Sequence, residues 1–199
     1  MYETSKSIFH RLADSRYATR YFVGQGIDIG AGPDALGQYA EFFPLMRSCR
    51  AWDMPDGDAE LLATVEDNSF DFVHSSHCLE HMRNVEVALD NWLRVLKPGG
   101  HLVCLVPDED LYEQGVFPST FNSDHKHTFT IHKKTSWSPK SINVTTLLAN
   151  TRADIQVKKI ELLDATFRYS LLAALGKRLD QTTTPVGESA IEFIVKKLA

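Results

Sequence analysis

The sequence predicts an α/β fold, in which a doubly wound, mostly parallel sheet carries helices on both faces. Short apolar runs alternate with amphipathic stretches through the first half of the chain, which is typical of βαβ units. The run "HLVCLVP" (101–107) is apolar throughout, as expected of a strand that is covered on both faces. Two alternating segments, 155–163 and 189–197, predict an antiparallel pair that closes one edge of the sheet.

The remaining elements follow from local patterns. Mixed helical spacing predicts an N-terminal helix within 8–22, and short apolar runs predict strands at 26–30, 48–53 and 70–76. The stretch "NVEVALDNWLRVL" (84–96) predicts an amphipathic helix with Trp92 in the core. This helix ends at "KPGG", because Pro98 cannot continue it. A later helix is expected within 138–150.

Length and composition limit the classes of function. The 199 residues are 43% hydrophobic and 24% charged, which predicts a single domain over 1–199 with a substantial core. A net charge of −5 disfavours broad binding to nucleic-acid phosphates. We expect a cytoplasmic protein with reduced cysteines, because the sequence contains no signal-peptide pattern, no membrane-spanning run and no C-x-x-C spacing.

The stretch "GIDIGAGPDALG" (26–37) predicts a ligand-binding loop. Glycines after a strand let the main chain approach a ligand without a Cβ atom in the way. The third glycine, Gly37, is displaced from the G-x-G-x-x-G spacing, and Asp28 adds negative charge. Both features disfavour a diphosphate and favour a cofactor with a positive centre.

An acidic residue follows the second predicted strand. Asp53 comes 21 residues after Gly32, an offset at which a carboxylate reaches ribose hydroxyls. This spacing fits a nicotinamide dinucleotide as well. A nicotinamide-dependent oxidoreductase is therefore an alternative, although the sequence lacks Y-x-x-x-K and the intact glycine spacing.

Three stretches occur in a characteristic order: "IDIGAGP", "GDAELLATVEDNSFDFVHSSHCLEHM" and "LRVLKPGGHLVCLVPD". Together they resemble the consecutive motifs of class I S-adenosylmethionine-dependent methyltransferases, of the small bacterial methyltransferase type 11-like group. The resemblance implies a Rossmann-like fold with a cofactor-binding core at 26–108. It also implies S-adenosyl-L-methionine as the cofactor and methyl transfer as the reaction.

The resemblance assigns residues to the methionine end of the cofactor. It implies that the backbone around Gly30 and Gly32 lies against the methionine moiety, with Asp28 near its ammonium group. Ser76 and His77 would flank the methionine end and the methyl group that is transferred.

At the nucleoside end, the resemblance implies that Asp53 binds the ribose hydroxyls. Asp58 would accept from the adenine amino group, and the Ala59 N–H would reach a ring nitrogen. Only "MPDG" separates the two acids, so no complete βαβ unit fits between them. Either the third strand is abbreviated or missing, or one acid lacks its family role; Asp58 could instead cap a helix over 59–65.

The segment 109–150 is expected to form a lid and an acceptor-binding insertion. In an extended chain, His125 and His127 would face one side, and either could act as general base for an oxygen acceptor. Alternatively, both histidines hold the loop closed over the cofactor. A metal site formed with Asp124 is disfavoured by its short spacing, and no metal ligand is predicted.

Two residues of "LEHM", Glu80 and His81, look catalytic in isolation, but we expect them to orient their loop through hydrogen bonds. The sequence as a whole predicts O-methylation of a small molecule or a sugar-containing precursor. We expect no nucleic-acid partner and no membrane span, while exposed apolar edge residues could form a homodimer. The alternative from another class is a non-catalytic, cofactor-binding subunit of a complex.

Overall fold

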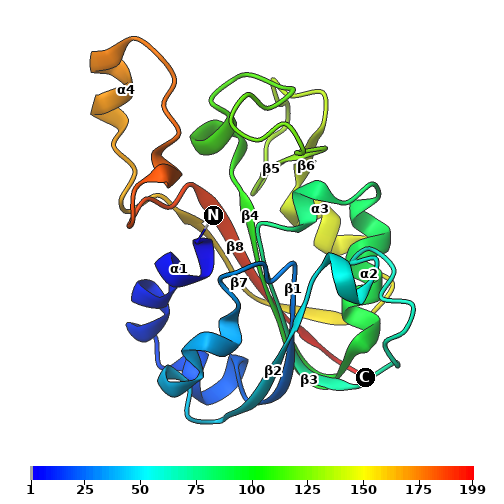
Figure 1. The fold of residues 1–199 in the computed structure, drawn as a ribbon. Helices are drawn as coiled ribbons and strands as arrows, with labels where there is room; N and C mark the ends of the chain where they lie inside the picture. Colours follow the sequence, from blue (N-terminus) through cyan, green and yellow to red (C-terminus); the bar gives the residue numbers. More distant parts are fainter. Residues whose placement is uncertain (1) are drawn as a thin grey trace.

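The computed structural model describes residues 2–199, which form a six-stranded sheet with the order β2-β1-β3-β4-β8-β7 (Figure 1). Strands β1 to β4 are parallel, and β8 runs antiparallel to both β4 and β7. The predicted α/β class and the antiparallel edge pair are therefore confirmed. The strands are β1 (Gly24–Ile29), β2 (Met46–Trp52), β3 (Phe70–Ser76), β4 (Leu96–Pro107), β7 (Ile155–Leu163) and β8 (Ala190–Lys197).

Helices cover both faces of this sheet (Figure 1). One face carries α1 (Glu3–Leu12) with the short turns η1 (Tyr17–Tyr21) and η2 (Leu36–Phe42), and the other face carries α2 (Val85–Val95) and α3 (Val144–Ala149). Each layer buries its own apolar cluster against the strands. None of the helices within residues 2–199 is both long and apolar enough to cross a membrane.

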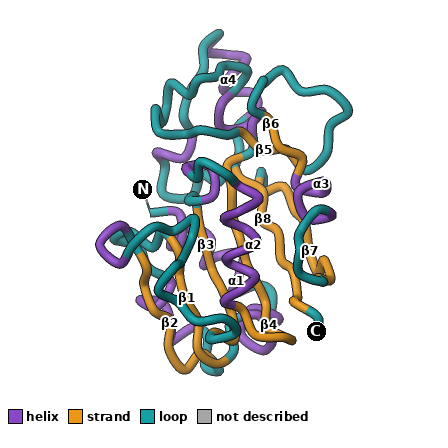
Figure 2. Tube along the Cα trace, turned by 90° about the vertical axis from the view of Figure 1, so that its right-hand side faces the viewer, coloured by secondary structure: helices purple, strands orange, loops and turns teal. Residues whose placement is uncertain are grey.

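A second group of elements lies beyond the carboxyl end of β4 (Figures 1 and 2). It contains η5 (Glu109–Glu113), the small parallel pair β5 (Thr128–Thr130) and β6 (Ser141–Asn143), and α4 (Tyr169–Leu175) between β7 and β8. This group stands at the end of the sheet where the parallel strands finish.

Helix α2 forms where its amphipathic pattern predicts it. Asn84 caps its first turn, with the side-chain oxygen accepting from the Val87 N–H at 3.1 Å. Trp92 is fully buried, and its indole N–H donates to the Ala59 carbonyl at 2.8 Å. The helix therefore anchors the loop that follows β2 as well as the core.

Three helix predictions were wrong in detail. The helix within 8–22 is interrupted, because the Asp14 carboxylate accepts from the Arg16 N–H and turns the chain between α1 and η1. The start of 138–150 is extended, since residues 141–143 pair with β5. No helix forms over 59–65, and the Asp58 side chain instead accepts from the Glu60 N–H at 2.8 Å.

The third strand of the usual doubly wound order is missing. An abbreviated or missing strand was one of the two alternatives that the sequence left open. Between β2 and β3 the described chain contains turns and the single short helix η3 (Met54–Asp56), so β2 is the edge strand. β1 pairs with β2 on one side and β3 on the other, so the strand order reverses there. In such sheets ligands bind at the carboxyl ends beside this reversal.

Candidate functional site

A cavity of about 570 Å³ lies at the carboxyl ends of β1, β2 and β3. Gly30 follows β1, Asp53 follows β2 and His77 follows β3, so all three strands deliver residues to it. Its position at the reversal of strand order is the one expected for a ligand site. The lining residues are Gly30, Asp53, Met54, Gly57, Asp58, Ala59, His77, Cys78, His81, Met82 and Asp124.

The glycine loop uses conformations that favour glycine. Gly30 has φ +74°, and its N–H donates to the Trp52 carbonyl at 2.9 Å. A Cβ atom there would lie 2.5 Å from the Cys78 sulfur. Gly32 has φ +52°, but the position of its Cβ is open space. The first glycine is therefore required by close packing, whereas the second leaves bare backbone exposed.

Asp53 is fixed by the backbone around it. Its Oδ2 accepts from the Gly32 N–H at 3.0 Å, and its Oδ1 accepts from the Met54 N–H at 2.7 Å. Its own N–H donates to the Asp56 carboxylate at 3.1 Å, completing a capping box. The half-buried carboxylate thus has a set orientation at the cavity wall, with lone pairs left to accept from hydroxyl groups.

Asp58 and Ala59 line the same cavity as Asp53, although no third strand separates them. The Asp58 Oδ2 lies 2.7 Å from Arg83 Nη2 in an exposed ion pair. The compact loop after β2 therefore brings both predicted nucleoside acids to one wall.

Asp28 does not fit its predicted contact with a cofactor ammonium. It is buried beneath the loop and is absent from the cavity lining. Its Oδ2 accepts from the Leu36 N–H at 2.6 Å, and its Oδ1 lies 2.6 Å from His74 Nδ1. Both oxygens are thus occupied inside the protein, and the carboxylate fixes the path of the glycine loop.

Of the two residues predicted beside the methyl group, only His77 lines the cavity. Ser76 precedes it with a buried hydroxyl that has no hydrogen-bond partner within residues 2–199. His77 takes φ +53°, and burial lowers its pKa to about 3. Its imidazole is therefore neutral at physiological pH.

The predicted histidine pair is separated, because residues 121–127 form turns and loop rather than a strand. His125 is buried with its Nδ1 2.7 Å from Glu113 Oε1, and its ring packs edge-on against His81 at a centroid distance of 5.0 Å. His127 contributes to neither this contact nor the cavity lining; burial lowers its pKa. His125 thus packs its ring on the cavity residue His81, whereas the His127 imidazole contacts the backbone of Arg83 and Met82.

Glu80 and His81 differ in how their side chains compare with the sequence expectation. His81 does orient the loop, with its Nδ1 2.9 Å from Asp124 Oδ2. Glu80 is fully buried, yet neither oxygen of its carboxylate has a hydrogen-bond partner among the described residues. Asp124 lines the cavity from the segment expected to form the lid and acceptor-binding insertion, but no individual role was predicted for it.

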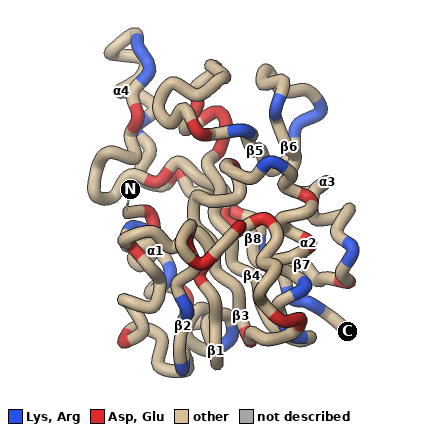
Figure 3. Tube along the Cα trace, turned by 45° about the vertical axis from the view of Figure 1, so that its right-hand side comes forward, with Lys and Arg blue, Asp and Glu red and all other residues tan. Residues whose placement is uncertain are grey.

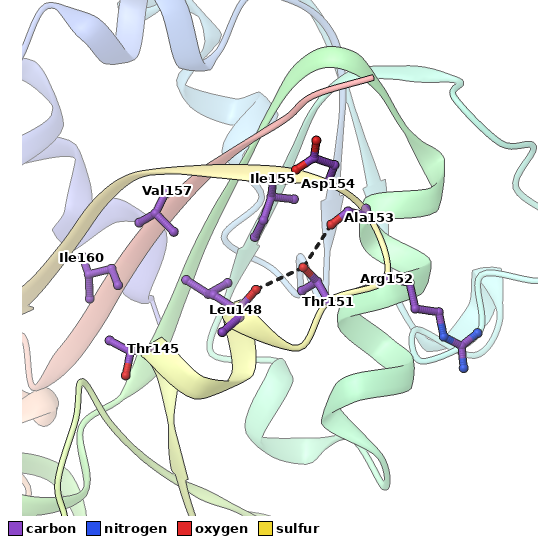
Figure 4. Close-up of a pocket in the computed structure, with 10 residues that line it drawn as sticks. Thr145, Leu148, Thr151, Arg152, Ala153, Asp154, Ile155, Val157 and Ile160 are labelled. Atoms are coloured by element: carbon purple, nitrogen blue, oxygen red, sulfur yellow. Dashed lines mark hydrogen bonds between the residues drawn. The ribbon is translucent and has the colours of Figure 1, made fainter.

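A second hollow, of about 490 Å³, lies between α3 and the edge strand β7 (Figure 4). Leu148, Ile155, Val157 and Ile160 give it an apolar wall, and Arg152 points away from that group. Asp154 is the only acidic residue in its lining, so the hollow offers no group of catalytic side chains.

Comparisons with known proteins agree with this architecture. Residues 27–104 match the model of a methyltransferase domain. No curated protein matches the sequence. The chain shares its fold with a SAM-dependent methyltransferase from Archaeoglobus fulgidus, at 15% identity and a TM-score of 0.57 over 97% of this chain and 94% of the other. The resemblance to the class I methyltransferase fold is thereby confirmed.

Two further solved structures share this fold. One is a putative methyltransferase of Haloferax volcanii in complex with the Trm112 methyltransferase activator, at 14% identity, a TM-score of 0.55 and coverage of 99% and 91%. The other is the [4+2]-cyclase SpnF, at 15% identity, a TM-score of 0.51 and coverage of 98% and 82%. At such identities the likeness establishes the fold, and the reaction must be argued from the site.

Proposed function

Because residues 27–104 match a methyltransferase domain, we propose that the chain is an S-adenosylmethionine-dependent methyltransferase. The observation that carries this proposal is the single cavity that gathers Gly30, Asp53, Asp58 and Ala59 at the reversal of strand order. Its volume of about 570 Å³ falls in the usual range of small-molecule sites.

The cavity residues divide between the two ends of the cofactor. Asp53 binds the ribose hydroxyls through its backbone-fixed carboxylate, while Asp58 and the Ala59 N–H face the adenine. The backbone of Gly30 and Gly32 lies against the methionine moiety. This assignment is supported by the positions of Asp53, Asp58 and Ala59 on one wall and of Gly30 at the end of β1.

His77 belongs beside the transferring methyl group, while Ser76, the residue before it at the end of β3, keeps its hydroxyl buried outside the cavity lining. A neutral imidazole suits a sulfonium neighbour, because it adds no positive charge beside the cation. The remaining cavity residues contribute shape and exclude water. In-line methyl transfer depends mainly on such positioning of the nucleophile.

The acceptor we propose is a small molecule or a saccharide, methylated at oxygen. Lysines and arginines are distributed over many elements rather than along one face (Figure 3), which does not favour a polyanion. His125 is the better-placed of the two predicted general bases, because its ring packs on His81 at the cavity wall.

Methyl transfer from labelled S-adenosylmethionine to a panel of hydroxylated small molecules and sugars tests this function. We expect label in at least one acceptor, with stoichiometric S-adenosylhomocysteine. His125→Ala should keep cofactor affinity and lose at least tenfold in kcat, because general-base help contributes about 10²–10⁴-fold. His132→Ala, which changes an exposed histidine outside the cavity lining, is the matched control.

The alternative is a non-catalytic, cofactor-binding subunit. The Haloferax volcanii methyltransferase that shares this fold was solved with an activator, which is the observation that favours a partner. Saturable S-adenosylmethionine binding without turnover on any acceptor, together with a co-purifying protein, would support this alternative. Failure to bind the cofactor would contradict both.

A further inference from the structure

The carboxylate of Glu80 is a buried polar group. It is fully buried in η4 (Leu79–His81), and neither Oε1 nor Oε2 has a hydrogen-bond partner within residues 2–199. Burying a carboxylate without a partner costs several kcal/mol by general estimates. Buried polar groups in native proteins nearly always have a partner, and an ion bound by the carboxylate would be such a partner.

Three imidazoles surround this carboxylate. The distances to Glu80 Oε1 are 3.7 Å from His77 Nδ1, 3.8 Å from His81 Nε2 and 3.8 Å from His125 Nε2. These are too long for hydrogen bonds. They are close to the separation of about 3.4 Å between ligand atoms in a tetrahedral site with bonds near 2.1 Å.

Two of these imidazoles are oriented as metal-binding histidines are. His81 Nδ1 lies 2.9 Å from Asp124 Oδ2, and His125 Nδ1 lies 2.7 Å from Glu113 Oε1. A ring that donates Nδ1–H to a carboxylate presents a lone pair at Nε2. In both residues it is Nε2 that faces Glu80.

We propose that Glu80, His81 and His125 bind one divalent first-row transition-metal ion and leave a further coordination position open. The ligand atoms of Glu80, His81 and His125 lie within 4.8 Å of one another. Imidazoles with one carboxylate suit zinc, iron, cobalt or manganese, whereas magnesium and calcium prefer ligand sets made of oxygen.

The chain builds this site from two segments that are distant in sequence. Glu80 and His81 come from the turn after β3, and His125 comes from the predicted lid. The ion would therefore tie the 109–150 segment to the sheet. The H-x-H pattern at 125–127 indicated the segment that supplies His125, but His127 is not part of the group.

The site adjoins the cavity, since His81 lines the cavity and is also one of the three ligands. An ion here would be placed to bind and polarise an acceptor oxygen, which is a standard role of catalytic metals. That role rests on the proposed methyl transfer, whereas metal binding itself does not. With Nε2 on the ion and Nδ1–H on Glu113, the His125 imidazole has no free lone pair, so the polarising ion takes the place of His125 as general base.

Titration of the chelator-treated full chain with Zn²⁺, Mn²⁺, Co²⁺ and Mg²⁺, followed by calorimetry without cofactor or acceptor, tests the site. We expect one equivalent of transition metal, weaker Mg²⁺ binding, and visible Co²⁺ absorption bands from nitrogen ligation. His81→Gln, at a partly exposed position, should weaken binding at least tenfold, and Glu113→Gln about 10–100-fold through His125. His132→Gln should bind as the parent does.

Absence of saturable transition-metal binding by the folded parent chain would overturn the proposal. Equal affinity in His81→Gln and His132→Gln, or tighter binding of Mg²⁺ than of every transition metal tested, would do so as well. Because no cofactor is present in this experiment, its failure leaves methyl transfer untouched, and failure of S-adenosylmethionine binding leaves the metal site untouched.

Discussion

Gly30 and Gly32 lie in one loop, but different surroundings constrain them. An alanine at 30 would place its Cβ within 2.6 Å of both Cys78 side-chain atoms, in addition to the strain at φ +74°. We expect Gly30→Ala to lower the free energy of unfolding by about 2–4 kcal/mol, from overpacking and backbone strain together.

Gly32→Ala is the matched control, because its Cβ would meet open space at a similar positive φ. It should cost only about 1 kcal/mol of backbone strain. Urea unfolding of both variants measures the difference. Equal losses of stability would show that packing against Cys78 is not what requires Gly30.

At the residue scale, the sequence predicted site residues where the chemistry is local. Asp53 was found from its offset after the glycine loop, and it lines the cavity at the end of β2. The ammonium contact expected of Asp28 stays a prediction, and a strand pattern does not show that His74 and the Leu36 N–H occupy its two oxygens. Asp124 reaches the cavity through tertiary contacts that have no counterpart in sequence spacing.

Helix α2 depends on a single side-chain cap. The Asn84 oxygen accepts from the Val87 N–H, while the Asn84 backbone N–H donates to the Glu60 carboxylate at 3.1 Å. We expect Asn84→Ala to lower the free energy of unfolding by about 1 kcal/mol, while Asn84→Asp retains the acceptor and most of the stability. Chemical denaturation at neutral pH checks both. If the Asp variant lost as much as the Ala variant, capping would not be the cause.

Elements with long, regular patterns were predicted best. The segments 70–76 and 155–163 match β3 and β7 at both ends, because each reads as a strand without interruption. Short elements were predicted poorly. Residues 141–143 become β6 only because β5 lies beside them, and pairing between distant segments leaves little trace in either segment alone.

A buried ionic network around Glu192 on β8 connects this strand with α1, η1 and β7. Its carboxylate lies 3.3 Å from Arg11 Nη2 of α1 and 3.1 Å from Lys159 Nζ of β7, and it also accepts from the Tyr17 hydroxyl. The Nη2 atom of Arg11 also lies 3.1 Å from His74 Nε2. The N-terminal helix, the sheet edge and the glycine loop are therefore linked through one carboxylate.

Burial alone would raise the pKa of Glu192. The His10 imidazole, 3.5 Å away, and the charges of Arg11 and Lys159 outweigh burial and lower that pKa below its ordinary value of 4.5. A lowered folded-state pKa means that Glu192 contributes stability above pH 4.5 and loses that contribution as pH falls through the folded-state value.

Glu192→Gln should therefore lower the free energy of unfolding by roughly 3–5 kcal/mol at pH 7, because it leaves buried cations without their partner. The difference from the parent chain should shrink below about pH 4.5. Urea unfolding at several pH values measures it. Glu161→Gln, which removes a half-exposed partner of Lys159, should cost about 1 kcal/mol or less. A pH-independent difference for Glu192→Gln would contradict the ionic account.

At the scale of the whole molecule, the order of motifs predicted the sheet and its ligand end. The short spacing between Asp53 and Asp58 already indicated the missing strand. The arrangement of 109–150 could not be predicted, because His125 is positioned by Glu113 and His81 rather than by strand periodicity. Short-range patterns are visible in a sequence, whereas a cluster assembled from separate loops is not.

In the proposed function, this cavity binds S-adenosylmethionine with its ribose on Asp53. Calorimetric titration of the parent chain and of Asp53→Ala with S-adenosylmethionine, S-adenosylhomocysteine and NADH tests it most directly, with Asp67→Ala as a surface control. We predict saturable binding of the first two ligands and none of NADH. Asp53→Ala should weaken both at least tenfold, because a charged hydrogen-bond partner is worth about 1.5–3 kcal/mol. No binding of either sulfur ligand by the parent chain, or unchanged affinity in Asp53→Ala, would contradict the account.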